Sequence, residues 1–267
     1  MPRLAVLDES KDTKGHPIFG VGGIVVDLGR IQGVEAAWVA AKGTHEAIKF
    51  SETPADRCLT LFQAIGRMPL QALVCLLEDF RPPRMRIPGT SSRRDIYVVR
   101  QAFEYALQRL SKQFTEGSPE PHFVAFDRRD DFPQLEGVYS RCYEGSWPIG
   151  RGQPWPALKT VGFTASLLTL AHGPLHEMAD FVVGGLTLFA AVRCAELRGK
   201  RLDEGRLAKH RTCAPVVSLL PRRPGTGTRV GWSVVVHPKQ LTGKELLKPR
   251  LETWLDELED RGSGLGP

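Results

Sequence analysis

The chain has 267 residues, of which 42% are hydrophobic and 25% charged, a composition typical of a globular protein and unlike that of a low-complexity chain. Its 36 basic residues outnumber the 30 acidic ones and leave a net charge of +6, which is compatible with binding to a polyanion but does not require it. The length accommodates one large domain, or one domain with a sizeable appendage.

The cysteines and the apolar segments indicate in which cellular compartment the protein is expected. Five cysteines are scattered along the chain and none forms a Cys-x-x-Cys pair, so we expect reduced thiols and a cytoplasmic protein. The apolar run Leu4–Leu7 ends in charged residues, so we expect no signal peptide. No uninterrupted apolar stretch approaches the ~18–20 residues of a membrane span, and we expect a soluble protein without membrane contact.

The hydrophobic pattern predicts an initial run of strands and then alternating helices and strands. In chain order the predicted elements are a strand at 4–8, a strand at 18–26, a short helix at 54–65, a strand at 70–77, a helix at 95–114, a strand at 122–127, a helix at 133–143, a strand at 158–163 and a helix at 175–197. This order predicts an α/β fold with a mixed five-stranded sheet flanked by helices.

Three glycines in the second predicted strand, Gly20, Gly22 and Gly23, superficially suggest a phosphate-binding loop. They lie within a strand-like segment, and no Gly-Lys-Ser/Thr sequence follows them. We therefore interpret them as positions where another part of the backbone approaches the strand closely.

The segment 198–267 has basic stretches, a Pro/Gly turn, a strand candidate at 231–236 and a final amphipathic helix. We expect a core domain at 1–197 and a C-terminal extension at 198–267 that packs on it, with a flexible tail at 262–267. The apolar face of the final helix is a candidate contact for a second copy of the chain or for a protein partner.

Three aspartates lie on or beside apolar elements, where a charge is costly unless something uses it. Asp8 follows the first apolar run, Asp127 closes the strand at 122–127, and Asp180 interrupts an otherwise apolar helix. The first and fourth strands should be neighbours at the centre of the sheet, so we expect the three carboxylates to converge. Carboxylate oxygens suit Mg²⁺ and Mn²⁺, and without metal we expect crowding by like charges to raise the pKa of at least one aspartate. The alternative is that each acid is a cap, a turn residue or half of an ion pair.

Two further acids are candidate metal ligands. Glu177 lies three residues before Asp180 and shares its helix face. Glu9 follows Asp8, and its side chain should point to the opposite face if the strand continues.

His172 and His176 are four residues apart, a spacing that suggests zinc. Gly173 and Pro174 lie between them, so one continuous helix that presents both rings is not expected. His176 lies four residues before Asp180 and could orient that carboxylate or contact a phosphate, and we favour a capping or carboxylate-orienting role over zinc binding.

The order and spacing of these motifs resemble the domain of unknown function 3800 family, a ribonuclease H-like group found largely in prokaryotes and their mobile elements. The resemblance covers residues 4–197 and departs from the usual pattern at Lys11, where the family commonly has glycine, and at Glu177, where it commonly has glutamine. The motifs that carry it are Asp8-Glu9-Ser10-Lys11, the glycine-rich strand Phe19–Val26, Asp127 and the segment His176–Phe181.

The resemblance implies a ribonuclease H-like fold with Asp8, Asp127 and Asp180 as catalytic metal ligands. We therefore predict a metal-dependent nuclease that hydrolyses RNA or DNA, in which two ions ~3.5–4 Å apart activate water and stabilise the leaving oxygen. The alternative is a catalytically inactive binding or scaffolding module of a nucleoprotein or defence assembly. Retention of all three aspartates favours the enzyme.

Phosphates beside the scissile one need positive partners from the protein. Lys49 lies in Ile48–Phe50, which resembles the family's Glu-hydrophobic-Lys stretch with its acid displaced to Glu46. The other candidates belong to a Pro- and Arg-rich segment and are Arg84, Arg86, Arg93 and Arg94.

Replacing these four arginines by Ala should flatten the slope of log affinity against log salt by roughly 0.7–0.9 for each phosphate that is no longer neutralised. Binding should weaken alike on all sequences, because side chains that bind phosphates do not read bases, and metal binding should be unchanged. Titrations of labelled nucleic acid at several salt concentrations measure the slope. An unaltered slope would assign phosphate binding to the basic C-terminal stretches instead.

Overall fold

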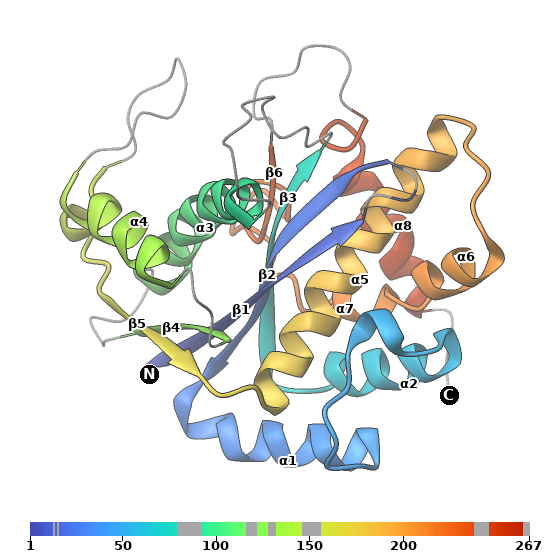
Figure 1. Ribbon diagram of the computed structural model, residues 1–267, viewed down its shortest axis with the longest axis horizontal. Coiled ribbons are helices and arrows are strands. Elements are labelled where there is room, and N and C mark those ends of the chain that lie inside the picture. Colours follow the sequence, from blue (N-terminus) through green and yellow to red (C-terminus); the bar gives the residue numbers. More distant parts are fainter. Residues whose placement is uncertain are drawn as a thin grey trace.

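The computed structural model describes residues 1–12, 14, 16–78, 92–115, 122–127, 132–145, 156–237 and 246–263. At the centre of this described part is a mixed sheet of six strands in the order β5-β4-β1-β2-β3-β6 (Figure 1). The strands are β1 (Arg3–Asp12), β2 (Ile18–Asp27), β3 (Leu70–Glu78), β4 (His122–Asp127), β5 (Ala165–Leu170) and β6 (Val234–His237).

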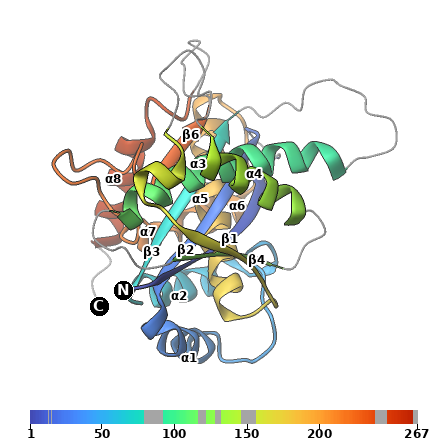
Figure 2. The same cartoon turned by 90° about the vertical axis from the view of Figure 1, so that its left-hand side faces the viewer.

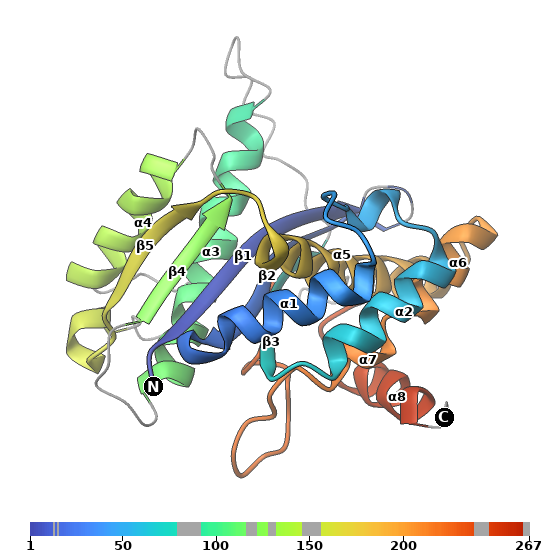
Figure 3. The same ribbon diagram turned by 90° about the horizontal axis from the view of Figure 1, so that it is seen from below.

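Two groups of helices cover the two faces of the sheet (Figure 2 and Figure 3). The helices are α1 (Ile31–Lys42), α2 (Ala55–Gly66), α3 (Ser92–Thr115), α4 (Phe132–Glu144), α5 (Pro174–Leu197), α6 (Glu204–Arg211), α7 (Ala214–Val217) and α8 (Leu251–Ser263). Helices α3 and α4 pack on one face, while α5 lies on the other with α1, α2, α7 and α8 around it. Short 3₁₀ turns complete the described elements: η1 (Leu28–Arg30), η2 (Phe50–Glu52) and η3 (Leu158–Val161).

The pairing of the strands confirms the predicted mixed sheet. Strand β2 is antiparallel to both β1 and β3, while β4 pairs parallel with β1, β5 with β4 and β6 with β3. Of the six described strands, β2 alone therefore runs against the direction of the others. The first and fourth strands are neighbours at the centre, as predicted.

Helix α5 lies against β2 at two of the three glycines singled out in the sequence. A Cβ atom on Gly23, whose φ is +157°, would lie 3.0 Å from the Cβ of Ala179 and would collide with the carbonyl oxygen of Val6. A Cβ on Gly20 would collide with Thr187. The interpretation as close approach of backbone is confirmed at Gly23, where the atom that a side chain would meet first belongs to the backbone of β1. At Gly20 the close neighbour is instead a side chain of α5, and a larger residue there would push the helix off the sheet.

Helix α5 is long and apolar enough to cross a membrane, but 89% of its apolar 18-residue stretch is buried inside the structure.

Two sequence predictions of strands need correction. The segment predicted as a strand at 158–163 forms the turn η3, which Gly162 ends with a left-handed φ of +70°, and β5 begins only at Ala165. The described sheet has six strands rather than five, because β6 from the C-terminal segment pairs with β3. Helix α1 was not predicted, because Gly33 lowers its helix propensity and its buried residues are few: Val34, Trp38 and Lys42.

The C-terminal segment shares the hydrophobic core of the rest of the chain. Residues of α7, β6 and α8 belong to the same buried cluster as α5, so the boundary expected at residue 197 does not separate two cores. Of the tail expected at 262–267, Gly262 and Ser263 close α8, and residues 264–267 lie outside the described part of the chain.

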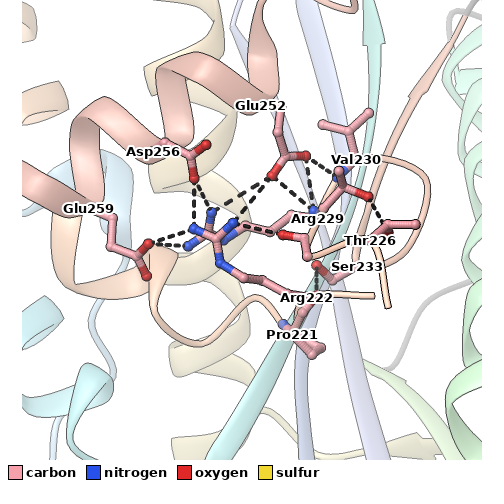
Figure 4. Close-up of polar contacts among 11 residues, drawn as sticks. Pro221, Arg222, Thr226, Arg229, Val230, Ser233, Glu252, Asp256 and Glu259 are labelled. Carbon is pink, nitrogen blue, oxygen red and sulfur yellow. Dashed lines mark hydrogen bonds and ion pairs between the residues drawn. The ribbon is translucent and has the colours of Figure 1, made fainter. Parts of the chain in front are cut away.

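A buried arginine ties α8 to the segment that leads into β6 (Figure 4). Arg229 is 1% exposed and its guanidinium lies 2.8 Å from Asp256 and 2.5 Å from Glu259, while Glu252 accepts hydrogen bonds from its backbone N–H at 2.9 Å. Arg222 reaches the same acids from the surface, at 2.7 Å from Asp256 and 2.9 Å from Glu259. Burial opposes the ionised form of Asp256 and Glu259, but hydrogen bonds from these two arginines outweigh it and lower both pKa values.

The two arginines form a matched pair for a stability test. Arg229→Ala should lower the free energy of unfolding by about 3 kcal/mol, because a buried charge and its packing are lost. Arg222→Ala should cost at most about 1 kcal/mol, because its side chain is 42% exposed and its ion pairs are screened by solvent. Urea denaturation of both variants measures the difference. Equal losses would contradict a special role for the buried arginine.

The lowered pKa values of these two acids also determine how stability changes with pH. The stabilisation from Asp256 and Glu259 is present above their unfolded pKa values and is lost as the pH falls through the lower folded values.

Candidate functional site

Asp8 lies within β1 rather than at its end, because the strand continues to Asp12. Along β1, Leu4 and Val6 belong to the core under α5, whereas Ala5 and Leu7 belong to the core under α3. The alternation therefore places half-buried Asp8 on the α5 side and Glu9 on the α3 side, which is the separation expected from the sequence. The Oδ1 atom of Asp8 accepts a hydrogen bond from the backbone N–H of Glu9 at 2.7 Å.

Asp127 is the last residue of β4. The parallel register pairs Leu7 with Phe126, so the next position along each strand is Asp8 on β1 and Asp127 on β4. The side chain of Asp127 lies outside the described part of the structure. The backbones of the two predicted ligands are therefore neighbours at the centre of the sheet.

Asp180 reaches the same level of the sheet from α5. Its neighbour Ala179 packs on Gly23, and Gly23 is the register partner of Leu7 on β1. The Oδ2 atom of Asp180 accepts a hydrogen bond from the backbone N–H of Phe50 at 2.7 Å. This contact fixes the turn η2 and the adjoining Lys49 beside the aspartate.

The pKa of Asp180 is shifted for a different reason from the one expected from the sequence. Burial raises its pKa, while the Phe50 N–H and the positive charges of Lys49, His172 and Lys209 act in the opposite direction. The pKa shift has the predicted direction, but its main cause is desolvation rather than crowding by like charges.

Two lysines place positive charge around this carboxylate. Exposed Lys49, expected near the acids, is close enough to lower the pKa of Asp180. Lys209 of α6, which the sequence analysis did not single out, donates a hydrogen bond to the carbonyl oxygen of Phe50, and its Nζ lies 4.2 Å from the centre of the Phe50 ring. Burial lowers the pKa of Lys209.

Glu177, a predicted metal ligand, is committed to contacts inside the core. Its carboxylate accepts a hydrogen bond from Trp38 Nε1 at 2.6 Å and lies 2.8 Å from Lys42 Nζ, and the residue is 2% exposed. The lysine also donates to the carbonyl oxygen of Glu46 at 2.9 Å. These partners give Glu177 a structural role that holds α1 against α5.

The two histidines before Asp180 stack on each other, with ring centres 5.9 Å apart. His176 is 2% exposed, so burial keeps it from the direct phosphate contact that the sequence suggested. His172 lies at the surface and acts on Asp180 through its charge.

The predicted phosphate-binding arginines fall largely outside the described part of the chain. Arg84 and Arg86 lie outside the described residues. Arg93 and Arg94 lie in the first turn of α3, and nothing of their side chains belongs to the described structure.

A different set of potential ligands lies at the far end of α5. Within the described part of the chain, the one group of three His, Cys, Asp or Glu residues whose ligand atoms all lie within 4.8 Å of one another is His16, Glu78 and Cys194. Burial, together with the charge of Glu78, raises the pKa of the Cys194 thiol. The sequence carried no local signal for this cluster, because its members are far apart in the chain and follow no metal-binding spacing.

No protein-family profile matches the chain, and no curated protein matches it either.

The ion pair at Glu177 can be tested apart from any activity. Lys42→Met should lower the free energy of unfolding by about 3–5 kcal/mol, because it leaves a buried carboxylate without its counter-charge. The double variant Lys42→Met, Glu177→Leu should recover most of that loss, since the charge is removed with its partner. Chemical denaturation of the single and double variants gives the coupling. If the double variant were no more stable than Lys42→Met, the contribution of Lys42 to stability would not come from its ion pair with Glu177.

Proposed function

We propose that the chain is a metal-dependent nuclease of ribonuclease H-like fold that hydrolyses phosphodiester bonds of RNA or DNA. The observation that carries the proposal is the convergence of three elements: parallel central strands with Asp8 and Asp127 at adjacent positions, and a crossing helix that carries Asp180 at the same level. The strand order, with β2 alone reversed among the described strands, supports the same reading. So does the resemblance to the domain of unknown function 3800 family.

The residues present fit a hard divalent cation. Carboxylate oxygens of Asp8 and Asp180 are the ligand type that Mg²⁺ and Mn²⁺ prefer, and both side chains are only half-buried. Burial disfavours the charged form of Asp180, and a cation beside it would offset that cost. A metal bound there would supply an activated water and would stabilise the charge on the leaving oxygen.

In this proposal Asp8, Asp127 and Asp180 hold the metal. The Phe50 N–H bond occupies one oxygen of Asp180 and keeps η2 in place, so exposed Lys49 stands beside the site as a partner for a neighbouring phosphate. Lys209 supports the same turn from α6 through the carbonyl oxygen of Phe50.

The decisive experiment compares Asp8→Asn and Asp180→Asn with Asp260→Asn, an aspartate of α8 remote in sequence from the three predicted ligands, which serves as the matched control. Cleavage of labelled single-stranded, duplex and hybrid substrates should require Mg²⁺ or Mn²⁺ and should fall at least about 100-fold in the first two variants, because each loses a metal ligand. The control should cleave like the wild type. Binding of Mn²⁺ measured by calorimetry should weaken in parallel.

The same variants report on the fold. Asparagine keeps an oxygen that can accept the Phe50 N–H but carries no charge, so Asp180→Asn should be as stable as the wild type or more so at neutral pH. The pKa of Asp180 is raised in the folded protein above its ordinary value of 3.8. The stability of the wild type should therefore fall as the pH rises from 3.8 through the folded pKa, because deprotonation is less favourable in the folded state. Asp180→Asn should lose this pH dependence.

Unchanged cleavage by folded Asp180→Asn protein would refute the proposal. Binding of nucleic acid without cleavage by the wild type at any metal concentration would favour the inactive binding module.

A further inference from the structure

A second cluster of ligand-type side chains lies away from the three aspartates. His16 precedes β2, Glu78 ends β3, and Cys194 lies near the C-terminal end of α5. Their ligand atoms all lie within 4.8 Å of one another. Cys194 is 14 residues beyond Asp180, a separation of about 21 Å along a straight helix, so the cluster is distinct from the proposed nuclease site.

The cluster is closed off from water. The exposed fractions of His16, Glu78 and Cys194 are 0%, 5% and 0%. Glu78 continues the row of β3 residues that faces α5, after Val74 and Leu76, and it therefore carries a carboxylate into an apolar layer. Such a charge is tolerated only where it is balanced.

Hydrogen bonds balance this carboxylate in part. His16 Nε2 lies 3.0 Å from Glu78 Oε1, and the backbone N–H groups of Leu246 and Leu247 donate to the two carboxylate oxygens at 2.7 and 2.9 Å. The other ring nitrogen of His16, Nδ1, is buried and has no hydrogen-bond partner among the described residues. His16 therefore has a buried ring nitrogen whose hydrogen-bonding capacity the described residues do not satisfy, within a cluster of ligand-type atoms.

We propose that His16, Glu78 and Cys194 bind one transition-metal ion, with Zn²⁺ as the ion that this set of nitrogen, oxygen and sulfur ligands selects. The thiolate and imidazole exclude Mg²⁺ and Ca²⁺ as preferred ions, whereas Zn²⁺ binds all three ligand types. One divalent ion with one carboxylate, one thiolate and a neutral imidazole has no net charge, which suits a site without solvent. Three protein ligands leave a fourth position for water or a main-chain oxygen.

The metal has a structural role in this proposal. The three ligands come from the β1–β2 connection, the end of β3 and the end of α5, and Glu78 also holds the backbone at Leu246 and Leu247 ahead of α8. An ion there would link these segments at the edge of the core, where the bound ion stabilises the folded state by mass action.

The test adds Co²⁺, a spectroscopic substitute for Zn²⁺, to the full-length chain after treatment with a chelator. The wild type should bind Co²⁺ with a thiolate-to-cobalt charge-transfer band, and Zn²⁺ should displace it. Cys194→Ser should lose the band, while Cys142→Ser, which replaces a buried cysteine on α4 under the other face of the sheet, should keep it. Zn²⁺ at 100 times its Kd should raise the Tm of the wild type by about 5–10 °C and that of Cys194→Ser much less.

A wild-type protein without a thiolate band would overturn the proposal without need of any variant. A band that survives in folded Cys194→Ser or His16→Gln protein would overturn it as well. The outcome is independent of the nuclease proposal, because Asp8→Asn should keep the band whether or not it cleaves nucleic acid.

Discussion

The close contact of α5 with β1 and β2 is the constraint on which the rest of the structure depends. Gly20 and Gly23 carry no side chain, so Thr187 and Ala179 of α5 pack directly against the backbone of β2. That approach sets Asp180 at the level of Asp8 and carries the far end of α5 to the end of β3. The outer helices then pack on α5, where Gly184 and Gly185 admit the rings of Phe50 and Phe62.

Charges in this interior are divided into those that are balanced inside the protein and those that are accessible from outside. Glu177 is closed off by Trp38 and Lys42. Arg229 is closed off by the acids of α8. Asp8 and Asp180 keep partial exposure, and the charges around Asp180 come largely from residues at or near the surface. The metal-binding role proposed for these aspartates requires such access to a hydrated cation and a substrate.

The C-terminal segment completes the sheet and the core. Strand β6 covers the edge of β3, and the apolar face of α8, through Leu251, Trp254 and Leu255, is buried within the chain itself. A partner on that face of the helix would have to displace these contacts. The edge strands of the described sheet are β5 at one end and β6 at the other.

The sequence by itself determined the local elements and their periodicities. The alternation of side chains along the strand predicted at 4–8 placed Asp8 and Glu9 on opposite faces of the sheet. Helical spacing of apolar residues identified α3, α5 and α8, because these patterns repeat over a few residues. Tertiary structure alone decided which buried groups meet: Glu177 with Lys42, and His16 with Glu78 and Cys194. Each of these partners is more than 60 residues away from at least one other, so no local pattern connects them. The place of β5 after Gly162 and the sixth strand depended likewise on long-range packing, which outweighs local propensity where an apolar segment is short.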